Sequence, residues 1–185
     1  QLDGDLDVDA LAAALSDLVE RHRTLRTVYP TATEQVLLPA ERVVADPIAT
    51  PADALDDAAA EFAAAGFDLT VDRPIRTRLY RTAPRRHVLV VVLHHIAADG
   101  WSLTPLLRDI AVAYAAHRAG TSPTWAPLPV QYSDYARRQR AIAEDQLPFW
   151  LTELAGLPDE TTLPGDRPRP SEPTGRGVAH RSEER

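Results

Sequence analysis

Two adjacent histidines, His94 and His95, stand just before an acidic residue and a glycine, Asp99 and Gly100, in the segment HHIAADGWS. Imidazole is the side chain that most readily accepts and returns a proton near neutral pH, so both histidines are candidates for acid–base work. Core packing has no need of two neighbouring imidazoles followed by this pair. The segment therefore indicates chemistry by a histidine, and acyl transfer is the chemistry that we expect.

A strand and a helix must position these histidines. Residues 87–93 form an apolar run without alternation, which predicts a strand buried on both faces. If the extended geometry persists, His94 and His95 point to opposite faces, and only one of them can face a cleft. The other is expected to turn into the protein and hold the turn by a hydrogen bond. Residues 103–117 carry an apolar stripe at helical spacing.

Three residues beside the histidines have structural interpretations. Asp99 can pair with an arginine, cap the following helix or orient a histidine. Gly100 fits a position that needs a positive φ or a close backbone approach. Ser102 is a candidate N-cap for the following helix, and Trp101 is expected to pack in the core beneath the segment.

The rest of the chain alternates between strand and helix patterns. The fold class that this predicts is α/β, an α+β sandwich in which helices pack on a mixed sheet. The elements expected are a helix over 7–22 capped by Asp7, strands over 26–30 and 35–44, a helix that starts at residues 50–53, a hairpin of strands 75–82 and 87–93, and a long helix over 132–155.

Composition excludes several classes of protein. The formal net charge of −7 argues against a nucleic-acid partner, because phosphate binding needs a basic excess. The absence of cysteine excludes disulfides and thiolate chemistry. No apolar run approaches membrane-spanning length, so we expect no membrane partner and a cytoplasmic location. Metal binding by His94 and His95 is not expected, because adjacent strand side chains diverge and no third ligand has metal spacing.

Four segments in order resemble signatures of one family. Residues 94–100 match the HHxxxDG signature of the condensation domains of non-ribosomal peptide synthetases, in the chloramphenicol acetyltransferase-like superfamily. Residues 21–29 resemble RHExLRTxF, with Arg23 in place of the glutamate. Residues 132–136 resemble YxDYA, with Arg137 and Arg138 where a tryptophan is usual. Residues 149–170 resemble the segment that leaves the first lobe of that two-lobed fold.

The resemblance implies a domain organisation. Residues 1–157 are expected to be a partial N-terminal lobe, since no segment matches the family's opening SxAQxRLW signature. Residues 158–185, rich in proline and charge, are expected to be a linker toward a missing C-terminal lobe. The tunnel of the family lies between its lobes. We therefore expect this chain alone to be inactive and to self-associate.

The resemblance also implies the reaction. Condensation domains join a donor aminoacyl or peptidyl thioester to the amine of an acceptor aminoacyl thioester. Both substrates arrive on the 4'-phosphopantetheine of carrier proteins, so the domain itself binds no cofactor. Its partners are upstream and downstream peptidyl carrier domains and an adjacent adenylation domain. His95 is expected to contact the attacking amine, His94 and Asp99 to be architectural, and the Gly100 N–H to contact substrate or an oxyanion.

Two arginines are expected to support the site. By the resemblance Arg21 and Arg26 are structural, and Arg26 is a candidate ion-pair partner for Asp99. A surface arginine paired with Glu20 is the alternative.

Other functions stay open at this level. An epimerising or other acyltransferase member of the superfamily would share the histidine segment, and so would a non-catalytic recruitment domain with a degraded form of it. The sequence is silent on the donor and acceptor amino acids, on an L- or D-donor, on the product and on oligomeric state. It also leaves open whether His95 acts as a base or by positioning.

Overall fold

The computed structural model describes residues 1–158 and residue 172, and the remaining residues of the predicted linker lie outside it. The chain divides into two units, Gln1–Ile142 and Ala143–Arg185. The histidine segment and all the strands belong to the first unit.

A four-stranded mixed sheet with strand order β1-β6-β5-β4 forms the centre of the first unit. Its middle is the predicted hairpin, in which β5 (Ile75–Ala83) and β6 (Arg86–Leu93) pair antiparallel with Ile75 opposite Leu93. The two-residue strand β1 (Leu2–Asp3) pairs antiparallel with β6, and β4 (Ile48–Ala49) pairs parallel with β5.

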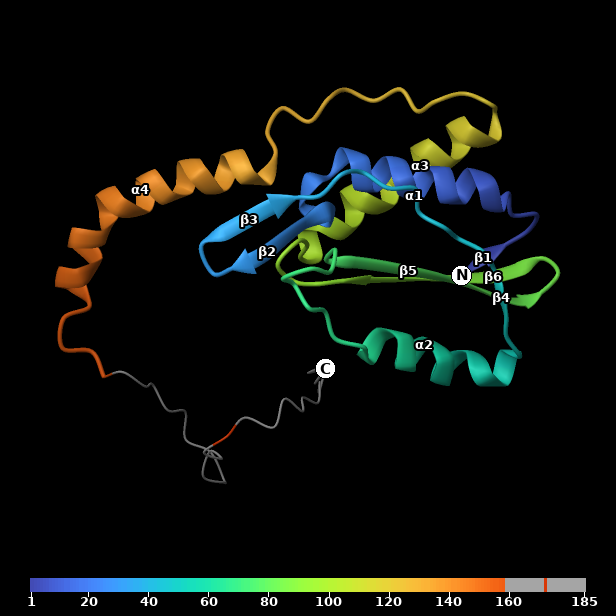
Figure 1. Cartoon of the computed structure of the whole chain (residues 1–185), viewed down its shortest axis with the longest axis horizontal. Helices are drawn as coiled ribbons and strands as arrows, with labels where there is room; N and C mark the ends of the chain where they lie inside the picture. Colours follow the sequence, from blue (N-terminus) through green and yellow to red (C-terminus); the bar gives the residue numbers. More distant parts are fainter. Residues whose placement is uncertain (159–171, 173–185) are drawn as a thin grey trace, which may run out of the picture. The chain divides into compact units, whose positions relative to one another are not determined.

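Helices lie on both faces of this sheet (Figure 1). Helices α1 (Val8–Arg21) and α3 (Leu103–Arg118) pack together over one face, and α2 (Leu55–Ala64) lies over the other. Side chains of α1 and β5 meet in a buried cluster that contains Leu11, Leu15 and Leu79. On the opposite face the Tyr80 hydroxyl donates to the Ala58 carbonyl at 2.9 Å. The predicted α/β class, a mixed sheet with packed helices, is confirmed.

The remaining elements connect these layers. A second sheet consists of β2 (Thr27–Thr31) and β3 (Glu34–Leu37), which are antiparallel. Short 3-10 turns cover Arg23–Arg26, Ala52–Ala54 and Gly100–Ser102. The long predicted helix is α4 (Tyr132–Glu153), which continues from the first unit into the second. Among residues 1–158, none of the helices combines the length and apolar character needed to cross a bilayer.

Local signals located some element ends correctly. The Asp7 carboxylate accepts from the Ala10 N–H at 2.9 Å and caps α1, as predicted. The helix start predicted at residues 50–53 is instead the 3-10 turn Ala52–Ala54, after which α2 begins, and neither element has a side-chain cap, because the Thr50 hydroxyl donates to the Ile48 carbonyl.

Two strand predictions need correction. The strand expected over 35–44 ends at Leu37, and Pro39, which has no N–H to donate to a ladder, follows two residues later. Residues 88–93 of β6 are half-buried rather than buried on both faces. Beyond the two residues that β1 pairs with, Arg86 and His87, β6 forms an edge of the sheet.

Removal of a core side chain tests this packing. Leu15 is 1% exposed, so Leu15→Ala should lower the free energy of unfolding by about 2–5 kcal/mol through lost burial and a residual cavity. The matched control is Leu107→Ala, since Leu107 is 65% exposed on α3, and it should change stability by less than about 0.5 kcal/mol. Urea unfolding followed by circular dichroism measures both. Equal effects would contradict the assigned core.

Candidate active site

The histidines lie in a tight turn at the end of β6. The strand ends at Leu93, and the His94 N–H donates to the Pro74 carbonyl at 3.0 Å, which continues the β5–β6 pairing by one bond. The Ala97 N–H then donates to the His94 carbonyl at 3.0 Å, so the chain reverses and does not stay extended. The extended geometry assumed for both histidines therefore ends at the first of them.

The ring of His94 belongs to this turn. Its Nδ1 accepts the Ile96 N–H at 3.0 Å, and its half-buried ring meets the edge of Phe67 at 5.8 Å between centroids and 87° between planes. Because Nδ1 accepts a hydrogen bond, the proton of the neutral ring is on Nε2. The His94 ring thus contacts the backbone of the turn, at Ile96, and one aromatic neighbour, Phe67.

His95 differs from its neighbour in being exposed. Ile96 beside it is also exposed, at 38%. The turn therefore directs one imidazole inward as an acceptor and presents the other on the surface, where a substrate can reach it.

A capping box closes the other end of the segment. The Asp99 Oδ1 accepts from the Ser102 N–H at 3.0 Å and from its hydroxyl at 2.7 Å, while the Asp99 N–H donates to the Ser102 Oγ at 3.1 Å. The Ser102 hydroxyl, followed by its backbone N–H, holds the pKa of the Asp99 carboxyl below its usual range. Asp99 is therefore the capping side chain of the 3-10 turn. Ser102 stands at the N-cap position of α3, as predicted, but its side chain makes no capping hydrogen bond to that helix.

Three further expectations for this segment are wrong. Arg26 donates from Nη1 to the Leu38 carbonyl and does not pair with Asp99, whose Oδ1 accepts both hydrogen bonds from Ser102. Trp101 is 90% exposed and not in the core. Gly100 has no positive φ, and an added Cβ there would meet nothing within 4 Å.

Arg21 supports the site from α1. Its Nε donates to the Asp109 Oδ2 at 2.9 Å, and its Nη1 donates to the Ala126 carbonyl at 2.8 Å. Its guanidinium also lies 4.7 Å from the ring centroid of Trp125. A structural role for Arg21 is therefore visible in its contacts, and its partner is Asp109 rather than Glu20.

Asp109 joins α3 to α1 through a buried carboxylate. Its side chain is 4% exposed, and His22 Nε2 lies 2.9 Å from the same Oδ2 that Arg21 contacts. Burial by itself raises the pKa of Asp109, but the hydrogen bonds from His22 and Arg21 outweigh it and hold that pKa below the usual range. The helix that begins at the histidine segment is thereby fixed to α1.

Sequence reasoning missed two residues that build the site. Asp109 lies on the buried face of α3 with Leu106 and Ala113, and an acid at that helical position was a readable signal. Phe67 touches His94 from a segment distant in the sequence, and no local pattern marks that contact.

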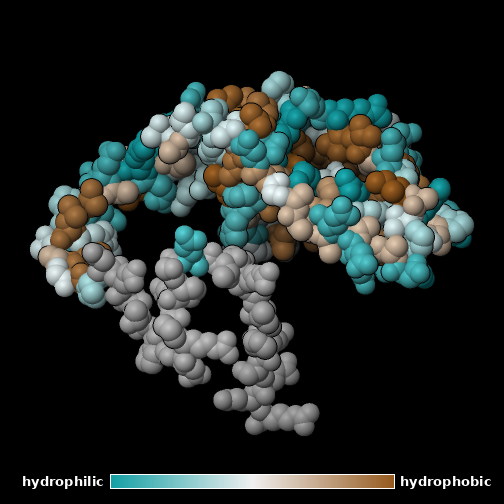
Figure 2. Space-filling view, turned by 60° about the horizontal axis from the view of Figure 1, so that its bottom comes forward, coloured by the Kyte–Doolittle hydropathy of each residue, from teal (hydrophilic) through white to brown (hydrophobic). Residues whose placement is uncertain are grey.

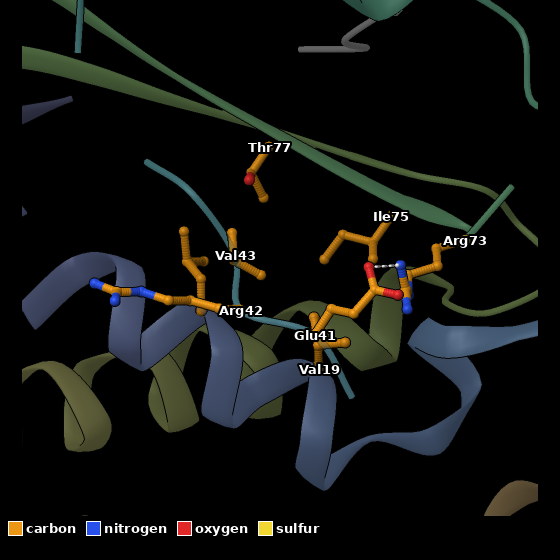
Figure 3. A pocket seen from close by; sticks show the side chains of 8 residues that line it. Val19, Glu41, Arg42, Val43, Arg73, Ile75 and Thr77 are labelled. Carbon is orange, nitrogen blue, oxygen red and sulfur yellow. Dashed lines mark hydrogen bonds and ion pairs between the residues drawn. The ribbon is translucent and has the colours of Figure 1, made fainter. Parts of the chain in front are cut away.

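Two pockets lie near this region. One of about 230 Å³ borders the histidine segment at Ala97 and Ser102 and is otherwise lined largely by apolar side chains, with His22 and Gln131 among the polar ones. The other, of about 130 Å³, lies between α1, residues 41–43 and the start of β5, where Glu41 and Arg73 form a 2.7 Å ion pair (Figure 3). A hydrogen bond from Arg73 holds the pKa of Glu41 below its usual range. The second pocket has no lining residue from 94–102.

Metal ligands do not gather in the part of the chain that the structure describes. No group of three or more His, Cys, Asp or Glu side chains there is arranged to hold an ion.

The Asp109 network predicts a pH-dependent stability. Asp109→Asn should lower the free energy of unfolding at pH 7 by about 3 kcal/mol, because Arg21, whose side chain is 11% exposed, is left without its counter-ion. The folded-state pKa is depressed, so the advantage of the wild type is complete above the unfolded-state pKa of about 3.9. It is lost as pH falls through the lower folded-state value.

Thermal unfolding of both proteins between pH 7 and pH 2 measures this advantage. Asp5→Asn is the control, because Asp5 is 82% exposed in its pair with Arg85 and should change little. A stability difference between wild type and Asp109→Asn that stays constant across the pH range would contradict the depressed pKa of Asp109.

Comparison with known proteins identifies the family of this chain. The Condensation domain family matches residues 1–181. The isonitrile lipopeptide synthase of Mycobacterium tuberculosis is 45% identical over 197 residues, which cover 97% of this chain and 8% of the synthase. The dimodular nonribosomal peptide synthase of Bacillus subtilis is 43% identical over 189 residues, which cover 94% of this chain and 8% of that synthase.

Solved structures give the same result. The X-domain from teicoplanin biosynthesis superposes with a TM-score of 0.86 at 40% identity, over 95% of this chain and 42% of that one. The same domain in complex with OxyB gives a TM-score of 0.85 at 42% identity, over 95% and 41%. This chain therefore spans less than half of the structures and a small part of the synthases that it matches. By its sequence and by its fold, the chain belongs to the condensation domains of non-ribosomal peptide synthetases.

Proposed function

We propose that this chain carries the catalytic histidine of a domain that forms peptide bonds between carrier-bound substrates. The observation that supports this most directly is the geometry of the histidine turn. His94 is occupied by the Ile96 N–H, Asp99 by Ser102, and His95 is left exposed between them. A turn with this division of tasks suits an imidazole that must meet a substrate.

The reaction is aminolysis of a thioester. The acceptor amine attacks the donor carbonyl carbon, a tetrahedral intermediate forms, the carbon–sulfur bond breaks, and the thiol and the new amide leave. An α-amine with a pKa of about 7.7–8.0 is partly neutral at cellular pH, so a strong base is not required. In this proposal the His95 imidazole receives the proton or hydrogen-bonds the attacking amine, and the Gly100 N–H faces the developing oxyanion.

Positioning supplies much of the rate in such a scheme. Orientation of two tethered reactants is worth about 7–11 kcal/mol, more than a positioned base adds. The tethers would be the 4'-phosphopantetheine arms of upstream and downstream carrier domains, next to an adenylation domain. The two synthases compared are far longer than this chain, which spans 8% of each, and in this proposal the partners would be parts of a comparably long protein.

Substitution of His95 tests the catalytic assignment. In the complete parent domain with loaded donor and acceptor carriers, His95→Ala should slow formation of the peptidyl product by about 10²–10⁴-fold, because the positioned proton acceptor is lost. Mass spectrometry of the downstream carrier follows the product. His117→Ala is the matched control, since His117 pairs with Asp17 at the far end of α3, about 20 Å along the helix from the segment.

Full activity of a folded His95→Ala domain would contradict a base at this position. Equal losses in the two histidine variants would contradict a specific role for His95.

A recruitment function is the second candidate. The observation that favours it is the pair of X-domain structures at 40% and 42% identity, one of which is a complex with OxyB. For this chain the partner would be another enzyme. A wild-type parent domain that forms no product with any loaded carrier pair, yet retains such an enzyme, would favour this candidate.

The second unit presents an apolar surface that bears on the behaviour of the chain alone. Figure 2 shows apolar side chains gathered on the surface at the C-terminal end of α4. They are at least half exposed: Leu147, Phe149, Trp150, Leu151 and Leu154. Contiguous apolar surface of this kind marks a contact site. We propose that the rest of the longer protein covers it.

The 185-residue chain should therefore self-associate and form no peptide product by itself. Sedimentation velocity should give a weight-average mass that rises with concentration, and Phe149→Ser with Leu151→Ser should reduce that rise. A single monomeric species at all concentrations would contradict the exposed contact site.

A further inference from the structure

A stack of side chains leads from β5 to the histidine turn on the α2 side of the sheet. The Arg76 guanidinium lies 4.2 Å from the ring centroid of Phe67, and Phe67 meets His94 edge-on at 5.8 Å. Arg76 pairs in register with Val92, close to the end of β6 at which the turn begins. One cation is therefore connected to a histidine of the family signature through a single aromatic ring.

The backbone before Phe67 is fixed by the same arginine. Its Nη1 donates to the Gly66 carbonyl at 3.1 Å, and its Nη2 donates to the Ala65 carbonyl. These carbonyls directly follow the last turn of α2, where a cation is favourable to the helix dipole. Arg76 thus holds both the ring of Phe67 and the chain that carries it.

A planar guanidinium is suited to this double task. It can stack on a ring with its face while its edge donates to two carbonyls, whereas a lysine ammonium is a single compact point of charge. The buried Nε of Arg76 has no hydrogen-bond partner among the described residues, which is a cost that the other contacts must outweigh.

We propose that Arg76 is a positioning residue, which acts through Phe67 to hold the His94 ring in the orientation that accepts the Ile96 N–H. The link to catalysis rests on the proposed function of His95. The structural part of the inference does not, because the ring state of His94 can be measured without any substrate.

Nitrogen spectroscopy of the imidazoles tests the structural part. In the ¹⁵N-labelled 185-residue chain, His94 should show well-separated Nδ1 and Nε2 signals with the proton on Nε2. Arg76→Lys and Phe67→Leu should move these two signals toward the average of a freely exchanging imidazole. The His117 signals should stay in place, because His117 pairs with Asp17.

Arg78→Lys is the matched control. Arg78 lies two residues along the same strand and stacks on Phe62 at 4.2 Å, a ring that makes no contact with His94 in the described structure. It should leave the His94 signals unchanged. Unchanged His94 signals in folded Arg76→Lys and Phe67→Leu would overturn the proposal, and so would an equal change in Arg78→Lys.

A kinetic arm tests the consequence in the complete parent domain. Arg76→Lys and Phe67→Leu should lower the rate at saturating carrier substrates by about 10–100-fold, with little change in KM, because a misplaced catalytic group affects the chemical step. Arg78→Lys should keep the wild-type rate. Altered His94 signals with an unaltered rate would overturn the positioning role. Absence of product from the wild type would instead count against the proposed function and leave the spectroscopic result to decide the contact.

Discussion

The ion pairs of the Asp109 carboxylate are the interactions on which the position of the histidine segment depends. A charge with only 4% of its side chain exposed must be paired, and the partners of Asp109 are Arg21, the last residue of α1, and His22, which follows it. The pairing fixes α1 against α3, and the histidine segment lies directly before α3. Arg21 then extends the restraint to Trp125 and Ala126, so one buried charge connects three parts of the first unit.

The histidine turn stands between two rigid supports. On one side, the His94 N–H at the end of β6 donates to the carbonyl of Pro74, the residue before β5. On the other side, the Asp99–Ser102 capping box begins the 3-10 turn before α3. Few residues lie between these supports, and the ring of His94 accepts a hydrogen bond from the N–H of one of them, Ile96. His95 lies between these restrained neighbours and is itself exposed.

The strong local patterns predicted most of the elements. The apolar run at 87–93, the stripe from Leu103 and the cap at Asp7 predicted β6, α3 and the start of α1, because each is encoded within a few neighbouring residues. A two-residue strand such as β4 has no period to detect.

Side-chain partners were harder to foresee than elements. Asp99 was the predicted partner of Arg26, but in the fold Arg26 donates to the Leu38 carbonyl, a backbone acceptor that no side-chain pattern marks. Trp101 is a second example, since the sequence around an indole does not indicate whether it is packed in the core or, as here, 90% exposed. The contact of Phe67 with His94 joins separate parts of the chain and depends on where β5 and α2 place them.

The acceptor role of the His94 Nδ1 has a consequence for which residues position 94 tolerates. An asparagine places its side-chain carbonyl oxygen near the location of Nδ1, so it is the closest replacement that retains an acceptor for the Ile96 N–H. A glutamine would place its oxygen one bond further out, near Nε2, and would leave that N–H without its partner. Substitution at this position is therefore governed by the distance of an acceptor from the backbone and not by basicity.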